Sequence, residues 1–285
     1  MSYRFTILGC GSSPGVPRID GEWGACDPNN PKNRRRRCSL LVERLGPQGT
    51  TTVLVDTSPD LREQMLMAGV RHIDGVLYTH GHADHIHGID DLRQYALLQR
   101  RLIDTYADSA TLAMLTERFS YCYETPPGSI YPPILKGHPI APGKIVRIDG
   151  QGGPVEALPV RQVHGPAHSL GFRFGGDLAA RRGGLCYSPD ISDVPADSIA
   201  LLERLDIWVV DALQYRVHLS HFALSQALEW IERLRPVRAV LTHMHTALDY
   251  ETLRLEIPAN IEPAYDGMVI EWPASGAQRQ NGPGG

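Results

Sequence analysis

The amino-acid sequence predicts an α/β protein with a single domain. Short apolar runs typical of buried strands alternate with amphipathic stretches typical of helices along most of the 285 residues. A hydrophobic content of 42% and a charged content of 21% are ordinary for a protein with a large core. Only the polar, Gly-rich end of the chain lacks this patterning. We therefore expect one domain over residues 1–273 and a disordered tail over residues 274–285.

The first half of the chain contains four predicted strands and three predicted helices. Runs of β-branched and aliphatic residues place the strands at 5–9, 39–43, 52–55 and 75–78. Apolar residues with helical spacing place the helices at 59–68, 89–98 and 111–123. Gly46 and Pro47 predict a hairpin turn between the second and third strands. Residues 126–142 are rich in Pro and Gly, so we expect an irregular insertion there.

The second half of the chain repeats this alternation. Five further strands are expected at 155–163, 171–174, 184–187, 207–210 and 239–242. Helices are expected between and after them, at 196–203, 223–234 and 250–253.

Charge and composition exclude several classes of protein. A net charge of −4 argues against a protein that binds long nucleic acid through its overall field. Five scattered cysteines do not make a disulfide scaffold, and the absence of a leader at Met1 predicts a cytoplasmic protein. No apolar span reaches 18 residues, so we expect no membrane partner. The run Lys32–Arg37 is locally basic, and it is either a solvated loop or a source of phosphate contacts.

Residues 79–85 carry the most informative motif, Thr-His-Gly-His-Ala-Asp-His, directly after the fourth predicted strand. Residues at i and i+2 of an extended segment point the same way, so His80 and His82 can bind one ion together. Asp84 and His85 follow further round the turn and can face a second ion. Imidazole and carboxylate ligands without thiolate suit Zn²⁺, Mn²⁺ or Fe²⁺. A solvated His-rich loop is the alternative, but an ordered spacing after a buried strand favours metal binding.

Further His and Asp residues follow other predicted strands. They are Asp56, His164, Asp190, Asp211 and His243. In open α/β sheets, ligands bind beyond the carboxyl ends of the strands. The sequence therefore places potential metal ligands repeatedly at one edge of the predicted sheet.

The order of these residues along the chain resembles the pattern of metallo-β-lactamase-fold hydrolases. The matching positions are Asp56, the motif at 80–85, His164, Asp190 and His243. The resemblance covers nearly the whole chain, to Trp272. It implies a four-layer αββα sandwich with a dinuclear metal site at the sandwich edge. Antibiotic-degrading members carry Cys where this chain has Asp190, so the resemblance indicates the two-metal hydrolytic branch.

The same resemblance implies a ligand set for two divalent metal ions, Mn²⁺ or Zn²⁺. One ion is held by His80, His82 and His164, and the other by Asp84, His85 and His243. Asp190 bridges both ions. His168 lies in the same loop as His164 and is the alternative ligand there. Asp56 is expected to orient a ligating imidazole, and Asp211 is expected to be structural.

A narrower resemblance concerns the substrate. The segments Leu8–Pro17, Asn33–Arg36, Ser220–Phe222 and Tyr265–Met268 are similar to a phosphodiesterase subgroup. It includes the phosphoribosyl cyclic phosphodiesterase of phosphonate breakdown and, more distantly, the endonuclease that trims tRNA 3′ ends. His221 matches an extra active-site histidine that touches the phosphate and protonates the leaving oxygen. We place Asn33, Arg34 and Ser188 beside His221 as candidate substrate-binding residues.

The sequence departs from that subgroup at one point. The phosphonate enzyme binds a structural zinc through a Cys-x-Cys-x-x-Cys cluster and a late His. This chain keeps only Cys26 in the corresponding stretch, with His245 as the nearest late His. One thiolate and one imidazole do not complete a tetrahedral zinc site, so we predict that this site is absent.

Together these features predict a metal-dependent phosphodiesterase for a small cyclic or nucleotide-like phosphate ester. A metal-bridging hydroxide is the expected nucleophile, oriented by Asp84, and His221 is the expected acid. A thioesterase of the glyoxalase II type is the alternative enzyme, and tRNA 3′-end cleavage is the alternative phosphodiester reaction. A binding protein that has lost activity is the third possibility. The family also suggests a homodimer.

Overall fold

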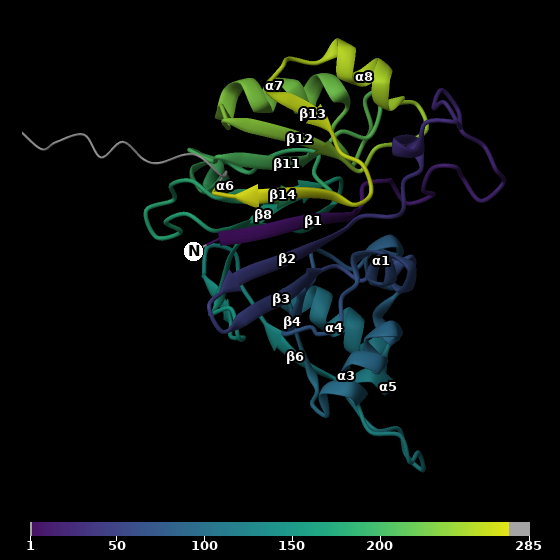
Figure 1. The fold of residues 1–285 in the computed structure, drawn as a ribbon, viewed down its shortest axis with the longest axis vertical. Coiled ribbons are helices and arrows are strands. Elements are labelled where there is room, and N and C mark those ends of the chain that lie inside the picture. The colour runs from purple at the N-terminus through teal and green to yellow at the C-terminus, as the bar shows by residue number, and fades with distance from the viewer. Residues whose placement is uncertain (1, 274–285) are drawn as a thin grey trace, which may run out of the picture.

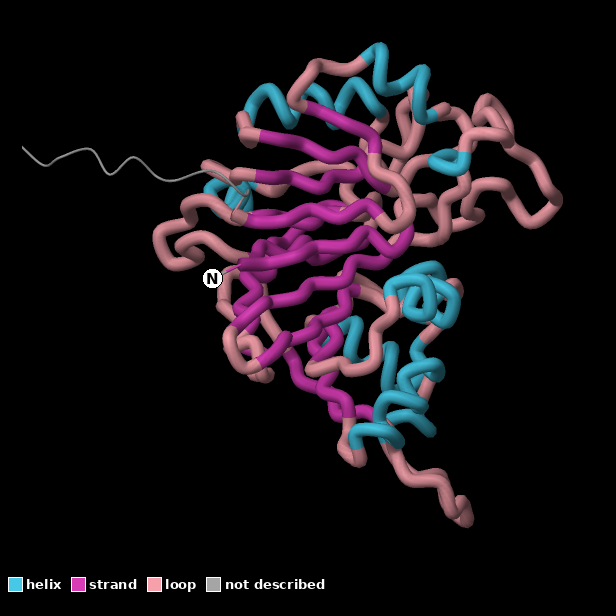
Figure 2. The backbone as a smooth tube through the Cα atoms, in the orientation of Figure 1, coloured by secondary structure: helices cyan, strands magenta, loops and turns pink. Residues whose placement is uncertain are grey.

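Two seven-stranded β-sheets pack face to face at the centre of the protein, and helices cover the outer face of each (Figures 1 and 2). The computed structural model describes residues 2–273, so the disordered tail expected at 274–285 lies outside the described residues. One cluster of apolar side chains fills the space between the sheets, and a second lies between the first sheet and its helices. This layering confirms the predicted αββα sandwich.

The first sheet consists mostly of strands from the first half of the chain. Its strand order is β14 (Met268–Trp272), β1 (Ser2–Gly9), β2 (Ser39–Gly46), β3 (Gly49–Val55), β4 (Gly75–Leu77), β5 (Ile103–Ala107) and β6 (Leu135–Pro139). The strands are antiparallel from β14 to β3 and parallel from β3 to β6. The helices of this half are α1 (Leu61–Ala68), α2 (Ala83–Ile86), α3 (Arg93–Gln99), α4 (Ser109–Arg118) and α5 (Ser120–Tyr123).

The second sheet comes from the second half of the chain. Its strand order is β13 (Ile261–Pro263), β12 (Arg238–Thr242), β11 (Ile207–Asp211), β10 (Leu185–Ser188), β9 (Ala167–Phe174), β8 (Val155–His164) and β7 (Val146–Ile148). The strands β10 to β13 are parallel, whereas β7 to β10 are antiparallel. Its helices are α6 (Ala196–Leu202), α7 (Leu224–Leu234) and α8 (Tyr250–Glu256).

Burial on both faces explains why the strands read as continuous apolar runs. In β2, Leu40 and Val42 point into the core between the sheets, and Leu41 points toward the helices of the first sheet. Successive side chains of a strand alternate between faces, so a sheet covered on both sides needs apolar residues at every position.

Five of the strands were not predicted from the sequence. Strand β6 lies inside the predicted insertion at 126–142, so the prediction of wholly irregular structure there is wrong. Its Gly137 and Pro139 hide a strand signal, and Pro is tolerated because β6 is the edge of the sheet. The short strands β5, β7, β13 and β14 alternate polar and apolar residues or are too brief for a pattern. Phe119 divides the helix expected at 111–123 into α4 and α5.

The carboxyl ends of strands from both sheets meet at one edge of the sandwich. The backbone amide of Leu170 donates to the Thr79 carbonyl across the two sheets at 2.9 Å. The amide of Met244, just after β12, donates to the Cys10 carbonyl, just after β1, at 2.9 Å. The segment that follows β1 in the first sheet and the segment that follows β12 in the second are therefore held side by side at this edge.

A buried carboxylate, Asp266, ties the end of β1 to the basic run. Its side chain accepts hydrogen bonds from the backbone amides of Arg36 at 2.8 Å and Cys10 at 3.2 Å. Burial raises the pKa of Asp266 from 3.8 to about 6, although the Arg36 amide and guanidinium oppose the rise.

Asp266 is expected to make stability depend on pH. A folded-state pKa above the unfolded value means that its contribution is full below about pH 4 and is lost as pH rises through 6. The interval from 3.8 to about 6, at about 1.4 kcal/mol per pH unit, amounts to about 3 kcal/mol. Urea unfolding of wild type and Asp266→Asn from pH 4 to 7 measures this difference. Parallel stability profiles of the two proteins would contradict the prediction.

Candidate metal centre

The motif at 79–85 is positioned by the end of β4 and the start of α2. Strand β4 ends at Leu77, and the extended segment after it carries His80 and His82. Helix α2 begins at Ala83 and carries Asp84 and His85. All of these ligand candidates except His82 are buried. The motif therefore contributes to two of the clusters of potential metal ligands, His80 and His82 to one and Asp84 and His85 to another.

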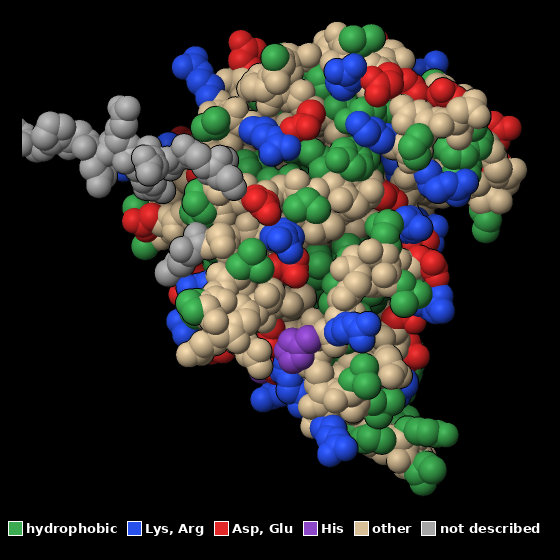
Figure 3. Space-filling model, in the orientation of Figure 1, with side chains coloured by type: hydrophobic (Ala, Val, Ile, Leu, Met, Phe, Trp, Pro, Cys, Tyr) green, Lys and Arg blue, Asp and Glu red, His purple; other side chains and the backbone are tan. Residues whose placement is uncertain are grey.

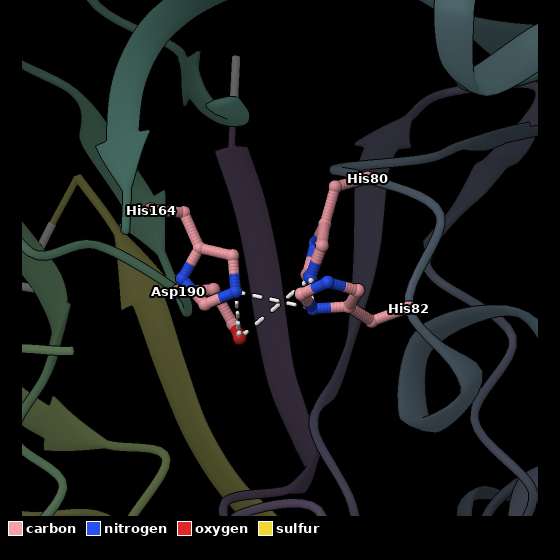
Figure 4. A group of neighbouring side chains, drawn as sticks. All are labelled: His80, His82, His164 and Asp190. Atoms are coloured by element: carbon pink, nitrogen blue, oxygen red, sulfur yellow. Dashed lines mark hydrogen bonds and ion pairs between the residues drawn. The ribbon is translucent and has the colours of Figure 1, made fainter. Parts of the chain in front are cut away.

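The first group of donor atoms joins the motif to the second sheet. His80 and His82 come from one side, and His164 at the end of β8 and Asp190 after β10 come from the other (Figure 4). His82 Nδ1 lies 2.9 Å from His80 Nε2 and 3.1 Å from His164 Nε2. Asp190 Oδ2 lies 3.7 Å from His80 Nε2 and 3.6 Å from His164 Nε2. Ligands of a tetrahedral zinc lie roughly 3.3 Å apart, which matches this spacing.

The second group shares the same aspartate through its other oxygen. Asp190 Oδ1 lies 2.9 Å from His85 Nε2 and 3.4 Å from His243 Nε2. Asp84 Oδ2 lies 3.5 Å from His85 Nε2 and 3.7 Å from His243 Nε2. The two oxygens of Asp190 therefore face different groups, as a bridging ligand requires.

Buried polar atoms without hydrogen bonds test whether metal ions fit these residues. Among the described residues, His85 Nε2, His243 Nε2 and Asp190 Oδ1 are buried and have no hydrogen-bond partner. Such atoms are rare in folded proteins and indicate a missing ion or water. Here they converge on one another at short distances, so the donor set fits divalent cations.

Contacts behind the ligands hold their orientation. Asp56, after β3, accepts from His85 Nδ1 at 2.7 Å and from the amide and hydroxyl of Thr79, each at 2.8 Å. His164 Nδ1 donates to the Ser220 carbonyl at 2.6 Å. Asp56 and His243 adopt left-handed backbone conformations with φ of 63° and 57°. Asp56 thus holds the imidazole of His85, which is a candidate metal ligand.

Burial and neighbouring charges set the protonation states that metal binding needs. Burial lowers the pKa of His164 to about 4 and lowers that of His80 well below its usual value. Burial alone would raise the pKa of Asp190, but His243, His85 and His80 hold it well below the ordinary range. Neutral imidazoles beside an ionised carboxylate are the forms that bind divalent cations, and the first group offers them. In the second group, Asp190, Asp84 and Asp56 overcome the effect of burial and raise the pKa of His85 well above its usual value, so a cation that binds there would displace a proton.

His221 lies against the second group and is held by Asp211. Its Nδ1 lies 2.7 Å from Asp211 Oδ2 and 3.9 Å from Asp190 Oδ2. Its ring stacks on His243 with centroids 4.5 Å apart. Its donor atom also groups with those of Asp190 and His243 within 4.8 Å, so ligation is geometrically open to it. Asp211 was expected to be only structural. Its place at the end of β11 was the one signal in the sequence that it could hold a side chain of the site.

Comparisons with known proteins agree with this geometry. A family model described as a beta-lactamase superfamily domain matches residues 51–244. A crystal structure of a diphosphatase from the PhnP family is 32% identical, with a TM-score of 0.82 over 95% of this chain and 98% of that chain. The chain belongs to the PhnP family of the beta-lactamase superfamily. It has the metallo-β-lactamase fold, and this fold implies divalent metal ions.

Other relatives of this PhnP-family protein carry different names. An octanoyltransferase of Porphyromonas gingivalis is 31% identical over 93% of this chain and 51% of its own length. A ribonuclease Z of Bradyrhizobium sp. is 29% identical over 50% of this chain and 46% of its own length. The chain thus spans about half the length of these curated relatives. The zinc-bound PqqB structure from Methylobacterium extorquens, 18% identical, shares the fold with a TM-score of 0.72 over 94% of this chain and 99% of that chain.

Two predicted substrate-binding residues are buried and bonded to other side chains. Asn33 is fully buried. Its Nδ2 donates to Asp249 Oδ2 at 2.6 Å, and its Oδ1 accepts from the backbone amide of Tyr250 at 2.8 Å. Ser188 is fully buried in β10, and its hydroxyl accepts from Trp208 Nε1 at 3.0 Å. This placement corrects the prediction of substrate contacts for both, because neither side chain reaches a surface that a ligand can touch.

Other polar residues near the motifs are also placed outside the clusters. Arg34 is exposed, and its guanidinium lies 5.4 Å from the Trp23 ring, so the structure does not bring it to the centre. His168 is exposed and pairs with Arg161 at 3.0 Å, which leaves His164 as the ligand candidate of that loop. His218 is exposed beside His221, with ring centroids 5.2 Å apart.

Arg35 lies in the region that corresponds to the structural zinc site of the subgroup. The buried Arg35 guanidinium donates to the carbonyls of Leu248 at 2.7 Å and His245 at 3.3 Å. Its Nη1 also lies 3.8 Å from Cys26 Sγ. A cationic guanidinium therefore lies beside Cys26, the one cysteine of the zinc-binding pattern that this chain keeps.

An open cavity adjoins the metal centre and provides room for a substrate. Its volume is about 640 Å³, which falls in the range of small-molecule sites. Its lining includes His82 and Asp84 of the centre, together with Ser13, Arg18 and Arg37. Ser13 Oγ donates to Asp84 Oδ2 at 2.9 Å. Nothing in the sequence distinguishes Arg18 and Arg37 from the other basic residues near them, so their place at this cavity was not predicted.

Asn33→Ala is expected to lower stability and leave substrate affinity unchanged. The substitution removes the partners of a buried amide and of Asp249, which costs about 2 kcal/mol. Thermal unfolding and KM measured on the same preparation test this expectation, with exposed Arg34→Ala as the matched control. A raised KM with unchanged stability would return Asn33 to the substrate site.

Proposed function

We propose that the protein is a dinuclear metal-dependent phosphodiesterase that cleaves a small cyclic or nucleotide-like phosphate ester. The observation that carries this proposal is the Asp211–His221 pair beside the metal ligands, with Nδ1 of His221 2.7 Å from Asp211 Oδ2. Because the Nδ1 hydrogen is donated to Asp211, Nε2 is the ring nitrogen left for the substrate. A positioned imidazole is suited to protonate a departing alkoxide.

The ligand set named above would hold two ions, Mn²⁺ or Zn²⁺. When bound, such ions would activate water and neutralise charge on the phosphoryl oxygens. The contacts of Asp84 with His85, His243 and Ser13 all use Oδ2. Its Oδ1 therefore remains available to orient an attacking water molecule. His221 would supply the proton that the leaving oxygen needs.

The cavity and the surface support a small substrate. The cavity of about 640 Å³ has the size of a nucleotide site. Basic and acidic side chains are mixed over the face seen in Figure 3, which lacks one continuous basic surface. Among residues 2–273, no helix has the length and apolar character that crossing a bilayer requires. A glyoxalase II-type thioesterase would use the same metals without needing the Asp211–His221 pair.

Paired assays on the metal-loaded protein separate these activities. With added Mn²⁺, we expect hydrolysis of bis(p-nitrophenyl) phosphate and little hydrolysis of S-lactoylglutathione. A precursor tRNA with a 3′ trailer tests the ribonuclease alternative, and we expect it to remain uncut. Asp190→Ala protein, purified identically, controls for contaminating phosphodiesterases. Preferential thioester hydrolysis would contradict the proposed function.

A further inference from the structure

The cavity beside the metal centre is lined by two arginines from different segments. Arg18 comes from the loop after β1, and Arg37 comes from the end of the basic run. His82 and Asp84 line the same cavity, so the guanidinium groups and the metal ligands face one space. The loop that carries Arg18 is closed by a hydrogen bond from the Arg18 amide to the Glu22 carbonyl at 2.9 Å.

Arg37 is anchored but retains free hydrogen-bond donors. Its backbone amide donates to Asp60 Oδ2 at 2.9 Å, and its Nε lies 3.0 Å from the same oxygen. No acceptor among residues 2–273 bonds to either of its terminal nitrogens. Gly15, with φ of 70°, lies beneath the side chain, where a Cβ would stand 3.8 Å from Nη1. Arg37 is therefore oriented by one edge of its guanidinium while the other edge stays open.

Arg18 brings a positive charge that the protein does not neutralise. Its Nη2 lies 3.0 Å from Nε2 of His245, and no carboxylate in the described part of the chain lies within 4.0 Å. The nearby Asp20 bonds to the Glu22 amide of its own loop at 3.2 Å. The guanidinium of Arg18 therefore lines the cavity without a carboxylate partner among the described residues.

We propose that Arg18 and Arg37 bind a second phosphoryl group of the substrate. The inference rests on the proposed function, since it assumes that one phosphoryl group lies at the metal centre. Guanidinium groups pair with phosphate oxygens through two parallel donors, and two arginines from separate segments can contact one phosphate from two sides. Preferred substrates then carry a phosphoryl group next to the one that is cleaved, and a diester with a single phosphate lacks this contact.

Calorimetric titration of the Mn²⁺-loaded protein tests the inference without relying on turnover. The probes are adenosine 5′-(α,β-methylene)diphosphate, which has two phosphoryl groups and a stable bridge, and AMP, which has one. We expect Arg18→Ala and Arg37→Ala each to weaken binding of the diphosphate analogue about tenfold and that of AMP less than about twofold. Arg37→Lys should retain part of the affinity.

The controls separate this inference from the proposed function. Arg34→Ala, a charge loss outside the cavity, is expected to change neither affinity, and metal content and thermal stability should be equal in all variants. Parallel weakening of both probes, unchanged affinity for the analogue, or failure of wild type to bind it at 1 mM would overturn the inference. Absence of bis(p-nitrophenyl) phosphate hydrolysis by wild type would instead overturn the proposed function, and the calorimetry would still decide the role of the arginines.

Discussion

Asp190→Ala is expected to release both metal ions and to lower hydrolysis of phosphate diesters roughly a thousandfold. The reason is the division of its carboxylate, since Oδ1 lies 2.9 Å from His85 Nε2 and Oδ2 lies 3.6 Å from His164 Nε2. Removing a ligand that serves one group should affect that group alone, whereas removing Asp190 weakens both. Metal equivalents per chain, measured by elemental analysis after dialysis, give the direct readout.

Two variants serve as comparisons for Asp190→Ala. Asp193→Ala changes an exposed carboxylate in the same loop and should keep both ions and full activity. His82→Ala changes a member of the first group only and should lose a single equivalent. If Asp190→Ala retained one full equivalent, the carboxylate would not bridge the two groups.

His221→Ala is expected to lower kcat about a hundredfold to a thousandfold on a diester with an alkoxide leaving group, with unchanged metal content. The effect on bis(p-nitrophenyl) phosphate should be smaller, because p-nitrophenolate departs without needing a proton. The variant should also lose the alkaline limb of the kcat–pH profile that a general acid produces. Loss of a metal equivalent would show instead that His221 is a ligand.

Asp211→Asn tests how His221 is positioned. Its carboxylate lies 2.7 Å from Nδ1 of His221 and also accepts from the Ile191 amide at 3.1 Å. We expect kcat to fall about tenfold to a hundredfold while KM stays within about twofold. His218→Ala, which removes an exposed ring beside His221, is the matched control and should change neither constant. If Asp211 had only a structural role, Asp211→Asn would lower the stability of the protein without changing the kcat–pH profile.

Local pattern was sufficient for the elements that are long, apolar and buried on both faces. Strand β8 and helix α7 were predicted within two residues at each end. Strand β6 was not, because its Gly and Pro read as a loop, and only its pairing with β5 makes it a strand. Short edge strands form because a neighbouring strand supplies their hydrogen-bond partners. Their own residues therefore do not predict a strand.

The candidate metal ligands were accessible to sequence reasoning because they lie at or just beyond the ends of buried strands. The contacts made by Asn33, Ser188 and Arg37 were not accessible, since all three are polar residues near motifs and nothing in their spacing separates them. Asn33 turns inward to the loop at 249–250, while Arg37, four residues later, lines the cavity. Contacts between segments that are separate in the chain decided these roles, from 20 residues apart for Ser188 and Trp208 to more than 200 for Asn33 and Asp249.

The sequence by itself determined the layered α/β fold and the residue types at the strand ends. Alternation of buried strands with helices, and His or Asp after them, follow from short-range patterns that the chain carries in its own order. Only the tertiary structure decided that the two oxygens of Asp190 face different groups, that Asp211 holds His221, and that Arg18 and Arg37 share a cavity with Asp84. These contacts join segments whose relative position depends on the packing of two sheets, which local pattern does not encode.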